Sequence, residues 1–172
     1  APVPRWAGAW MRRHGLSAAR GLCALVLTWA GVAWAEEASE TPAEPALWLN
    51  LGALTHHPNQ SRGYNENNSG LGLEYRFKPD TSVMVGSFYN SVRRDTNYAA
   101  VNWQPLALGD WKLGLAMGVI NGYPDVENAG YFVAALPMAS YEGKRFGVNL
   151  SLIPSLGQID GALVVQVKFR LF

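Results

Sequence analysis

The residues best suited to chemistry lie in one polar stretch, residues 56–69, which reads HHPNQSRGYNENNS. It begins with His56 and His57, and imidazole is the side chain that changes protonation nearest to neutral pH. A histidine beside a hydroxyl is the minimum arrangement for general-base activation of an acyl acceptor or a nucleophile. Glu66 adds a carboxylate. The stretch predicts a general-base site, although a polar loop without catalysis fits the same residues.

A metal site is not expected here. His56 and His57 are neighbours in the chain, so on a strand their side chains point to opposite faces, and no third ligand is evident. We also expect no cofactor. Arg62 lies in the same stretch, and Arg93 and Arg94 follow in a later one. The planar guanidinium fork suits phosphate groups, so these arginines are candidate contacts for a phosphorylated lipid.

The elements around this stretch alternate apolar residues with small or polar ones, a period of two that is typical of strands with two unlike faces. In the clearest case, Leu71, Leu73 and Phe77 point one way while Glu74 and Arg76 point the other. Eight strands are predicted, at residues 47–53, 70–77, 82–89, 98–104, 111–119, 130–141, 145–152 and 163–171. The sixth, 130–141, is nearly all apolar, so its inward face is ambiguous.

Short turns alternate with longer loops between these segments. Residues 78–81, 105–110 and 142–145 are short, whereas 56–69, 90–97, 121–128 and 154–161 are longer. This asymmetry, with apolar and polar faces on strands of about ten residues, is typical of outer-membrane proteins. An even strand number closes the sheet without an edge. We therefore predict an all-β fold, an eight-stranded antiparallel transmembrane β-barrel of the outer-membrane type, over a soluble β-sandwich.

Several charged and aromatic residues have expected places in such a barrel. Inward-facing charges should form an ion-pair network that fills a narrow lumen. Tryptophans near strand ends should anchor the barrel at the membrane interface. The inward charges are Glu74, Arg76, Lys112, Lys168 and Arg170, and the tryptophans are Trp48, Trp103 and Trp111.

The N-terminal part predicts export. Residues 11–35 have a basic start, an apolar middle and a small-x-small end, which indicates a secretory signal, with a membrane anchor as the alternative. Residues 1–10 are interpreted as an upstream extension, 36–46 as a flexible leader and 47–172 as the barrel. The net charge of +1 excludes an electrostatic nucleic-acid binder. We expect a monomer in a Gram-negative outer membrane, inserted by the barrel-assembly machinery.

Short motifs resemble the outer-membrane lipid A palmitoyltransferase (PagP) family. The Tyr64-Asn65-Glu66 segment before the glycine-rich second strand, the LPMAS segment at residues 136–140 and the Ile-Pro at residues 153–154 look like family motifs. The FYNS segment at residues 88–91 resembles the family's Phe-Lys-Asp-Ser. The resemblance implies transfer of a phospholipid acyl chain to lipid A, so both lipids are implied partners.

The resemblance also implies site residues. The family's catalytic histidine corresponds to His56 or His57 and its serine to Ser91, while its aspartate is replaced by Asn90. An amide cannot stabilise a histidinium as a carboxylate does, so Glu66 or Asp95 would have to take that part. Strand parity favours His56, because it follows the face of Trp48, Asn50 and Gly52.

Two prolines mark a possible opening in the barrel wall. Proline cannot donate to a sheet ladder, so Pro137 and Pro154, on or beside adjacent strands, can leave a lateral gap. In the family that the chain resembles, such a gap admits an acyl chain. The alternative is that Pro154 begins a turn and Pro137 marks a bulge. The predicted function is a lipid A acyltransferase, and the alternative is a non-catalytic barrel serving in surface adhesion or lipopolysaccharide packing.

Overall fold

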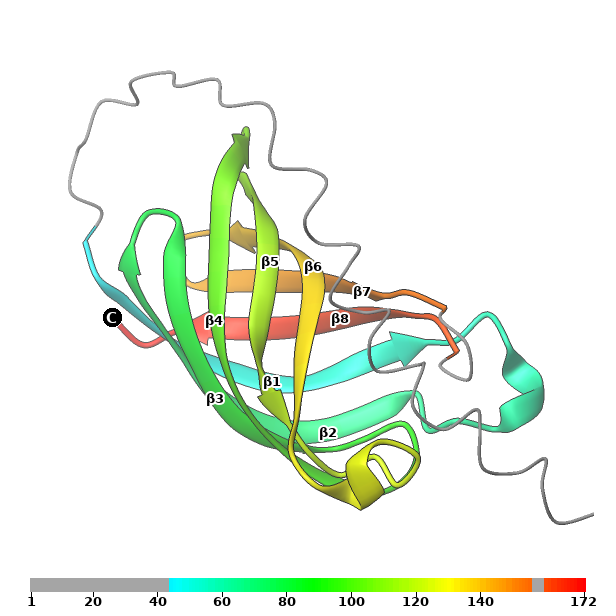
Figure 1. The fold of residues 1–172 in the computed structure, drawn as a ribbon. Helices are drawn as coiled ribbons and strands as arrows, with labels where there is room; N and C mark the ends of the chain where they lie inside the picture. The colour runs from blue at the N-terminus through cyan, green and yellow to red at the C-terminus, as the bar shows by residue number, and fades with distance from the viewer. Residues whose placement is uncertain (1–43, 156–159) are drawn as a thin grey trace, which may run out of the picture. The chain divides into compact units, whose positions relative to one another are not determined.

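The computed structural model describes residues 44–155 and 160–172. Each strand pairs antiparallel with the next in chain order, and the last returns to the first, so the sheet closes into a barrel (Figure 1). The predicted eight-stranded antiparallel β-barrel is confirmed. The strands are β1 (Ala46–His56), β2 (Asn67–Lys78), β3 (Thr81–Tyr89), β4 (Asp95–Leu108), β5 (Trp111–Ile120), β6 (Phe132–Glu142), β7 (Phe146–Ile153) and β8 (Ala162–Arg170).

The predicted upstream extension, secretory signal and most of the leader lie outside the described residues. In the described ranges 44–155 and 160–172, no helix is long and apolar enough to cross a membrane. Only two single 3-10 turns are described there, Gln60–Arg62 and Glu127–Ala129.

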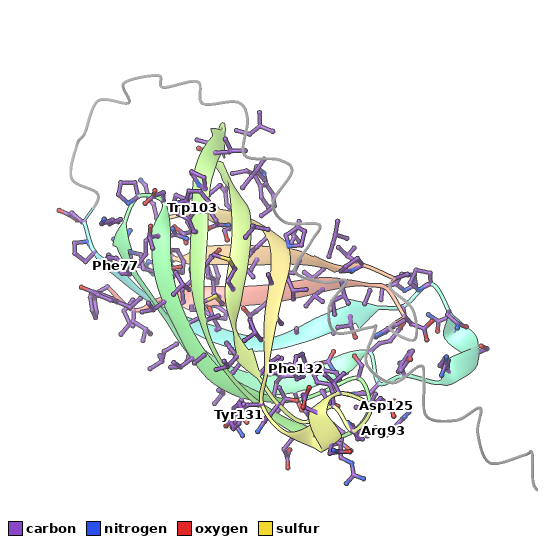
Figure 2. The ribbon with its side chains drawn as sticks, viewed as in Figure 1. Phe77, Arg93, Trp103, Asp125, Tyr131 and Phe132 are labelled. Atoms are coloured by element: carbon purple, nitrogen blue, oxygen red, sulfur yellow. The ribbon has the colours of Figure 1, made fainter. Side chains whose placement is uncertain are left out.

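The two ends of the barrel differ in their connections. At one end, here called the turn end, β2–β3 and β4–β5 are joined by two residues each and β6–β7 by three. At the other, the loop end, the connections span residues 57–66, 90–94, 121–131 and 154–161. Phe77 and Trp103 lie toward the turn end, whereas Arg93, Asp125 and Tyr131 lie toward the loop end (Figure 2).

The outer face of the barrel is apolar. On β2, Leu71, Leu73, Tyr75 and Phe77 are all exposed, whereas Glu74 between them is fully buried. The same alternation continues with Val83 and Val85 on β3 and Val101 and Trp103 on β4, which are also exposed. Apolar side chains that face outward around a closed barrel form the surface that a bilayer requires.

The fourth strand is longer than predicted. Residues 105–110 were expected to form a turn, but β4 runs to Leu108 and only Gly109 and Asp110 connect it to β5. The register shifts between Trp103 and Leu106, where Pro105 interrupts the ladder. Because the register shift accommodates the proline, pairing resumes at Leu106, and the β4–β5 hairpin extends beyond residue 104, where the strand was predicted to end (Figure 1).

A charged network fills the turn-end half of the interior. Lys168 Nζ lies 2.8 Å from Glu74 Oε2 and 2.7 Å from Glu142 Oε1. Arg76 Nε lies 2.8 Å from Glu142 Oε2, and Lys112 Nζ lies 2.7 Å from the same oxygen. The predicted inward network is therefore confirmed for these residues. Glu142 was assigned to a turn, yet it is the carboxylate that joins three of the cations.

Trp48 departs from its predicted place. It was expected to anchor the barrel at the membrane interface, but its side chain is 1% exposed and points inward. Lys168 Nζ lies 4.9 Å from the centre of its ring, a cation–π contact. Trp48 thus supports the interior network, whereas Trp103 does face outward.

Candidate functional site

The two loops predicted to carry the site are tied together at the loop end. The Asn65 backbone N–H donates to the Ser91 carbonyl at 2.9 Å, and Asn65 Nδ2 donates to the Asn90 carbonyl at 3.3 Å. The Thr55 backbone N–H donates to the Glu66 carbonyl at 2.9 Å, which closes the base of the first loop. The loop of residues 57–66, here called the histidine loop, and the loop of residues 90–94, here called the serine loop, are therefore neighbours, as the predicted topology requires.

The expected orientation of the two histidines is wrong. Strand parity placed His56 inward, but the register shifts between Leu51 and Ala53 and reverses the parity of the last part of β1. The His56 side chain is 69% exposed, with Nδ1 at 3.7 Å from Glu66 Oε1. His57 is 5% exposed. The buried imidazole at the loop end is that of His57.

His57 has the environment of a neutral base. Its ring lies 4.4 Å from that of Tyr64, and its Nδ1 has no hydrogen-bond partner among the described residues. Burial lowers the pKa of His57 below its ordinary value, against the nearby carboxylates of Glu66 and Asp160, which raise it. The imidazole is therefore neutral near pH 7 and can accept a proton.

Glu66 supports His57 through the backbone. Its Oε1 accepts from the His57 backbone N–H at 3.1 Å and from Gln60 Nε2 at 2.9 Å. Gln60 Nε2 also donates to the His57 carbonyl at 2.6 Å. The hydrogen bond from Gln60, followed by that from His57, lowers the pKa of Glu66. The carboxylate stays ionised and holds the histidine peptide in place.

Ser91 is 8% exposed, and its Oγ lies 3.5 Å from Thr55 Oγ1. No hydrogen bond joins either histidine to Ser91 in the part of the chain that the structure describes. The structure thus brings the predicted base and hydroxyl to the same end of the barrel without connecting them directly.

Asn90 has a structural reason to be an amide. Its Nδ2 donates to Thr96 Oγ1 at 2.9 Å and to the Gly122 carbonyl at 2.8 Å. Its Oδ1 accepts from the backbone N–H groups of Val92 at 2.9 Å and Arg94 at 3.0 Å. An aspartate would place a carboxylate oxygen against the Gly122 carbonyl, two acceptors facing each other. Asn90 organises the serine loop and joins it to the β5–β6 loop.

The three predicted phosphate-binding arginines have different surroundings. Arg62 Nε lies 3.2 Å from Asp160 Oδ2, and the Tyr64 hydroxyl donates to the same oxygen at 2.8 Å. Much of the charge of Arg62 is therefore balanced within the protein. Arg93 and Arg94 are exposed at the tip of the serine loop, where Arg93 has a φ of 58°.

The barrel wall is incompletely paired between β6 and β7. The ladder covers residues 138–142 of β6 and 147–151 of β7. β6 continues to Phe132 and stays paired with β5, but within the described residues this part of β6 has no partner on β7. The two strands diverge toward the loop end (Figure 1). Pro137 is the first β6 residue beyond the ladder, and Pro154 directly follows β7.

An apolar cavity of about 190 Å³ lies in the loop-end half of the interior. A cavity needs only about 10–15 Å³ to hold one water molecule, so this space can take a larger ligand. Ala134 and Leu136 of β6 and Ile153 of β7 line it beside the unpaired wall. Thr55 and Ser91 line it at the loops. The hydroxyls and the gap therefore border the same apolar space.

Tyr123 of the β5–β6 loop also lines this cavity. Its ring packs edge-on against Phe132, with 6.0 Å between the ring centres. Burial raises the pKa of Tyr123 to about 12, so its hydroxyl stays neutral. Toward the turn end the cavity is bordered by Asn149 and Gln166, beyond which the charged network begins.

The described residues contain no group of three or more His, Cys, Asp or Glu side chains that could hold a metal ion. Sequence reasoning missed Thr55, Asn68 and Asp160. Thr55 lies beyond the change of parity on β1, whereas Asn68 keeps the inward parity of Gly72 and Glu74 and lies just before residue 70, where that strand was predicted to begin. Asp160 lies in the β7–β8 loop, and its partners Arg62 and Tyr64 lie in the neighbouring β1–β2 loop, about 100 residues away in the sequence, so they leave no local pattern.

No protein-family model and no curated protein matches this sequence. Solved structures match in fold. The NMR structure of the de novo designed TMB2.3 matches with a TM-score of 0.54 and 14% identity, over 74% of this chain and 96% of that one. A second structure, described as de novo design of transmembrane beta-barrels, matches with a TM-score of 0.53 and 10% identity, over 76% and 99%.

The N-terminal β-barrel domain of Pseudomonas aeruginosa OprF gives a TM-score of 0.44 at 13% identity, over 74% of this chain and 97% of that one. At such identities the matches establish the fold alone. The chain is a small eight-stranded barrel of the transmembrane type. The resemblance to lipid A palmitoyltransferases rests on the sequence motifs.

Proposed function

We propose that this protein is an outer-membrane barrel that takes one acyl chain of an outer-leaflet phospholipid into its cavity and transfers that chain to lipid A. The observation that carries the proposal is the apolar cavity beside the unpaired part of β6. An acyl chain matches the apolar lining of this cavity and can reach it sideways from the bilayer, past the unpaired part of β6, without crossing water.

The outer-membrane location is supported by the apolar outer face and by the contrast between short turns and long loops. With the loop end outward, His57 and Ser91 would lie at the level of the outer leaflet, and the exposed Arg93 and Arg94 would face it. Phospholipid and lipid A are then the lipid partners, and the barrel-assembly machinery would insert the protein as a monomer.

In the proposed reaction, His57 takes the proton of a lipid A hydroxyl, whose oxygen attacks the phospholipid acyl carbonyl. The ester bond of the donor breaks, and its departing alkoxide recovers the proton to give a lysophospholipid. Glu66 holds the His57 peptide, and Asn90 shapes the loop that presents Ser91. The exposed guanidinium groups of Arg93 and Arg94 contact lipid phosphates.

Mass spectrometry of lipid A from cells with and without the protein tests the proposal. We expect an added acyl chain when the protein is present, and its loss in the Ala134→Phe variant, which fills the cavity from β6. The matched control is Ala135→Phe, one residue along the same strand on the exposed outer face. Lipid A of unchanged mass in cells with the folded wild-type barrel would refute the acyltransferase.

One observation favours a second function. All the hydrogen-bonding capacity of the Asn90 side chain is used by the loops and by Thr96 of β4, and His57 makes no hydrogen bond to Ser91 in the described residues. A non-catalytic barrel that binds lipid for lipopolysaccharide packing or serves in surface adhesion fits these facts. Cells lacking the protein would then show altered detergent sensitivity or adhesion while the mass of their lipid A stays the same.

A further inference from the structure

A chain of polar side chains leads from the wall of the barrel to Ser91. Asn68 Nδ2 lies 3.0 Å from the Tyr89 carbonyl oxygen, and Asn68 Oδ1 lies 2.8 Å from Thr55 Oγ1. Thr55 Oγ1 lies 3.5 Å from Ser91 Oγ. Asn68, Thr55 and Ser91 are 1%, 9% and 8% exposed, and all three line the apolar cavity.

The direction of this chain is fixed by its first member. A backbone carbonyl only accepts hydrogen bonds, so the Asn68 atom that faces Tyr89 is the amide nitrogen. The amide oxygen of Asn68 therefore faces Thr55 and takes the single hydroxyl proton of Thr55. The other neighbour of this hydroxyl is the Asn65 carbonyl at 3.4 Å, which is also an acceptor. In either case Thr55 has no proton left for Ser91.

Thr55 therefore presents only lone pairs to Ser91. Of the two hydroxyls, Ser91 alone can donate in this contact, although 3.5 Å is long for an O–H···O bond. When the Ser91 proton is directed to Thr55, the lone pairs of Ser91 Oγ face the cavity. The Ser91 peptide is held as well, because its carbonyl accepts from the Asn65 backbone N–H.

We propose that Ser91 is a hydrogen-bond acceptor for the lipid in the cavity, with Thr55 and Asn68 as the positioning residues that direct its proton away. The site would then select a phospholipid that carries an N–H or a hydroxyl in addition to its esters, within reach of Ser91, over one that offers ester groups alone. This inference rests on the proposed acyl-chain cavity. The hydroxyl that gives its proton to His57 belongs to lipid A, so the donor at Ser91 is a separate group, carried by the phospholipid in the cavity.

The test uses the folded barrel in detergent and the displacement of fluorescent cis-parinaric acid by single-chain probes. N-dodecylacetamide and dodecyl acetate differ only in N–H against O, and dodecan-1-ol supplies a hydroxyl. Each probe enters the micelle equally in every sample, so ratios compared between variants report the contact with the protein. One net hydrogen bond predicts a preference for the amide over the ester about fivefold greater in the wild type than in Ser91→Ala.

Thr55→Val is the decisive variant, because it removes the acceptor of the Ser91 proton. Ser91 is then free to donate to an ester carbonyl, so dodecyl acetate should gain affinity while the amide gains none. Thr55→Ser retains the hydroxyl and should retain the wild-type ratio. A merely structural role of Thr55 would weaken all probes alike. Variants are compared only after a heat-modifiable band shows that each has folded.

The outcomes separate this inference from the proposed function. If the wild type binds all the probes with the same ratios as Ser91→Ala, the acceptor role is wrong while the acyl-chain cavity stands. If dodecyl acetate gains no affinity in Thr55→Val, Thr55 does not direct the Ser91 proton, and that part of the inference is wrong. If no probe displaces cis-parinaric acid from the folded wild type, both proposals fail. A preference for dodecan-1-ol without one for the amide would assign the donor as a hydroxyl.

Discussion

Lys168 and Glu74 form an ion pair inside the barrel, with 2.8 Å between Nζ and Oε2 and both side chains fully buried. Glu74 also accepts from Ser82 Oγ at 2.8 Å and from Asn149 Nδ2 at 3.1 Å. Buried charges are tolerated when their hydrogen bonds are satisfied, as they are here. The network closes the turn-end half of the interior and leaves the apolar cavity confined to the loop-end half.

The Lys168→Met variant should destabilise the barrel strongly, because the Glu74 carboxylate stays buried after it has lost its ion pair with Lys168. Removing one member of a buried pair costs about 3–5 kcal/mol. Urea unfolding of the barrel in lipid vesicles measures the change in the free energy of unfolding. Lys144→Met, at an exposed turn position, is the control and should change it by less than about 0.5 kcal/mol. Equal effects of the two changes would show that the network contributes little.

The barrel and most of its inward residues could be predicted because the strand period of two is a local property of the sequence. The orientation of His56 and His57 could not, since it depends on a bulge set by pairing with β2 and β8. Gly52 lies at that bulge, where a Cβ would collide with the Asn68 carbonyl. A glycine inside a strand pattern is a signal for a bulge, and it would have favoured His57.

The role of Asn90 lay beyond the sequence for a different reason. Its amide is required by the Gly122 carbonyl, which comes from the β5–β6 loop, and by Thr96 of β4. Glu142 is a similar case, because a residue at the edge of a turn shows no sign of the three cations that surround it. Such assignments depend on contacts between segments distant in the chain.

The stability of the loop end should depend on pH through His57. Burial lowers its pKa below the ordinary value of 6.5, so the unfolded chain takes up the proton first as the pH falls. The contribution of His57 to the free energy of unfolding is therefore complete above pH 6.5 and decreases as the pH falls below it. Urea midpoints from about pH 8 to about pH 5 should decline more steeply for the wild type than for His57→Gln.

The control for this measurement is His56→Gln, which removes the exposed neighbour and should leave the steep decline in place. Titration of the two nearby carboxylates does not affect this comparison between about pH 8 and about pH 5. The pKa values of Glu66 and Asp160 are lowered from ordinary values of 4.5 and 3.8, so their contributions are lost only at lower pH. Parallel declines for the wild type and His57→Gln would mean that His57 is not buried in the folded barrel.

Asp160 should hold the histidine loop against the mouth of the barrel. Its carboxylate accepts from the Tyr64 hydroxyl, which lowers the pKa of Asp160 and raises that of Tyr64, and it pairs with Arg62. Asp160→Asn removes the charge and weakens both contacts, so trypsin should cleave after Arg62 several-fold faster. Mass spectrometry of the fragments measures this rate against cleavage after Arg93 in the same sample.

The matched control for this change is Asp125→Asn, in the β5–β6 loop, which should leave cleavage after Arg62 as in the wild type. If both substitutions accelerate cleavage equally, general loss of negative charge at the loop end explains the effect. If neither does, the contact between Asp160 and the histidine loop does not restrain that loop in solution.

Two glycines give Tyr98 its place inside the barrel. A Cβ on Gly72 would meet the Tyr98 hydroxyl and lie 2.9 Å from the Val85 carbonyl oxygen, and a Cβ on Gly86 would lie 2.6 Å from the same hydroxyl. Gly72→Ala should therefore cost about 1–3 kcal/mol of unfolding free energy. In a Tyr98→Leu background the cost should fall, giving a coupling of at least about 0.5 kcal/mol by urea unfolding. The three atoms nearest to a Cβ on Gly118 all belong to Ala99 and Ala100 of β4, so Tyr98→Leu should not relieve Gly118→Ala. Equal relief of both substitutions would mean that Tyr98→Leu loosens the whole sheet, and that the inward glycines of β2 and β3 are not there to admit this ring.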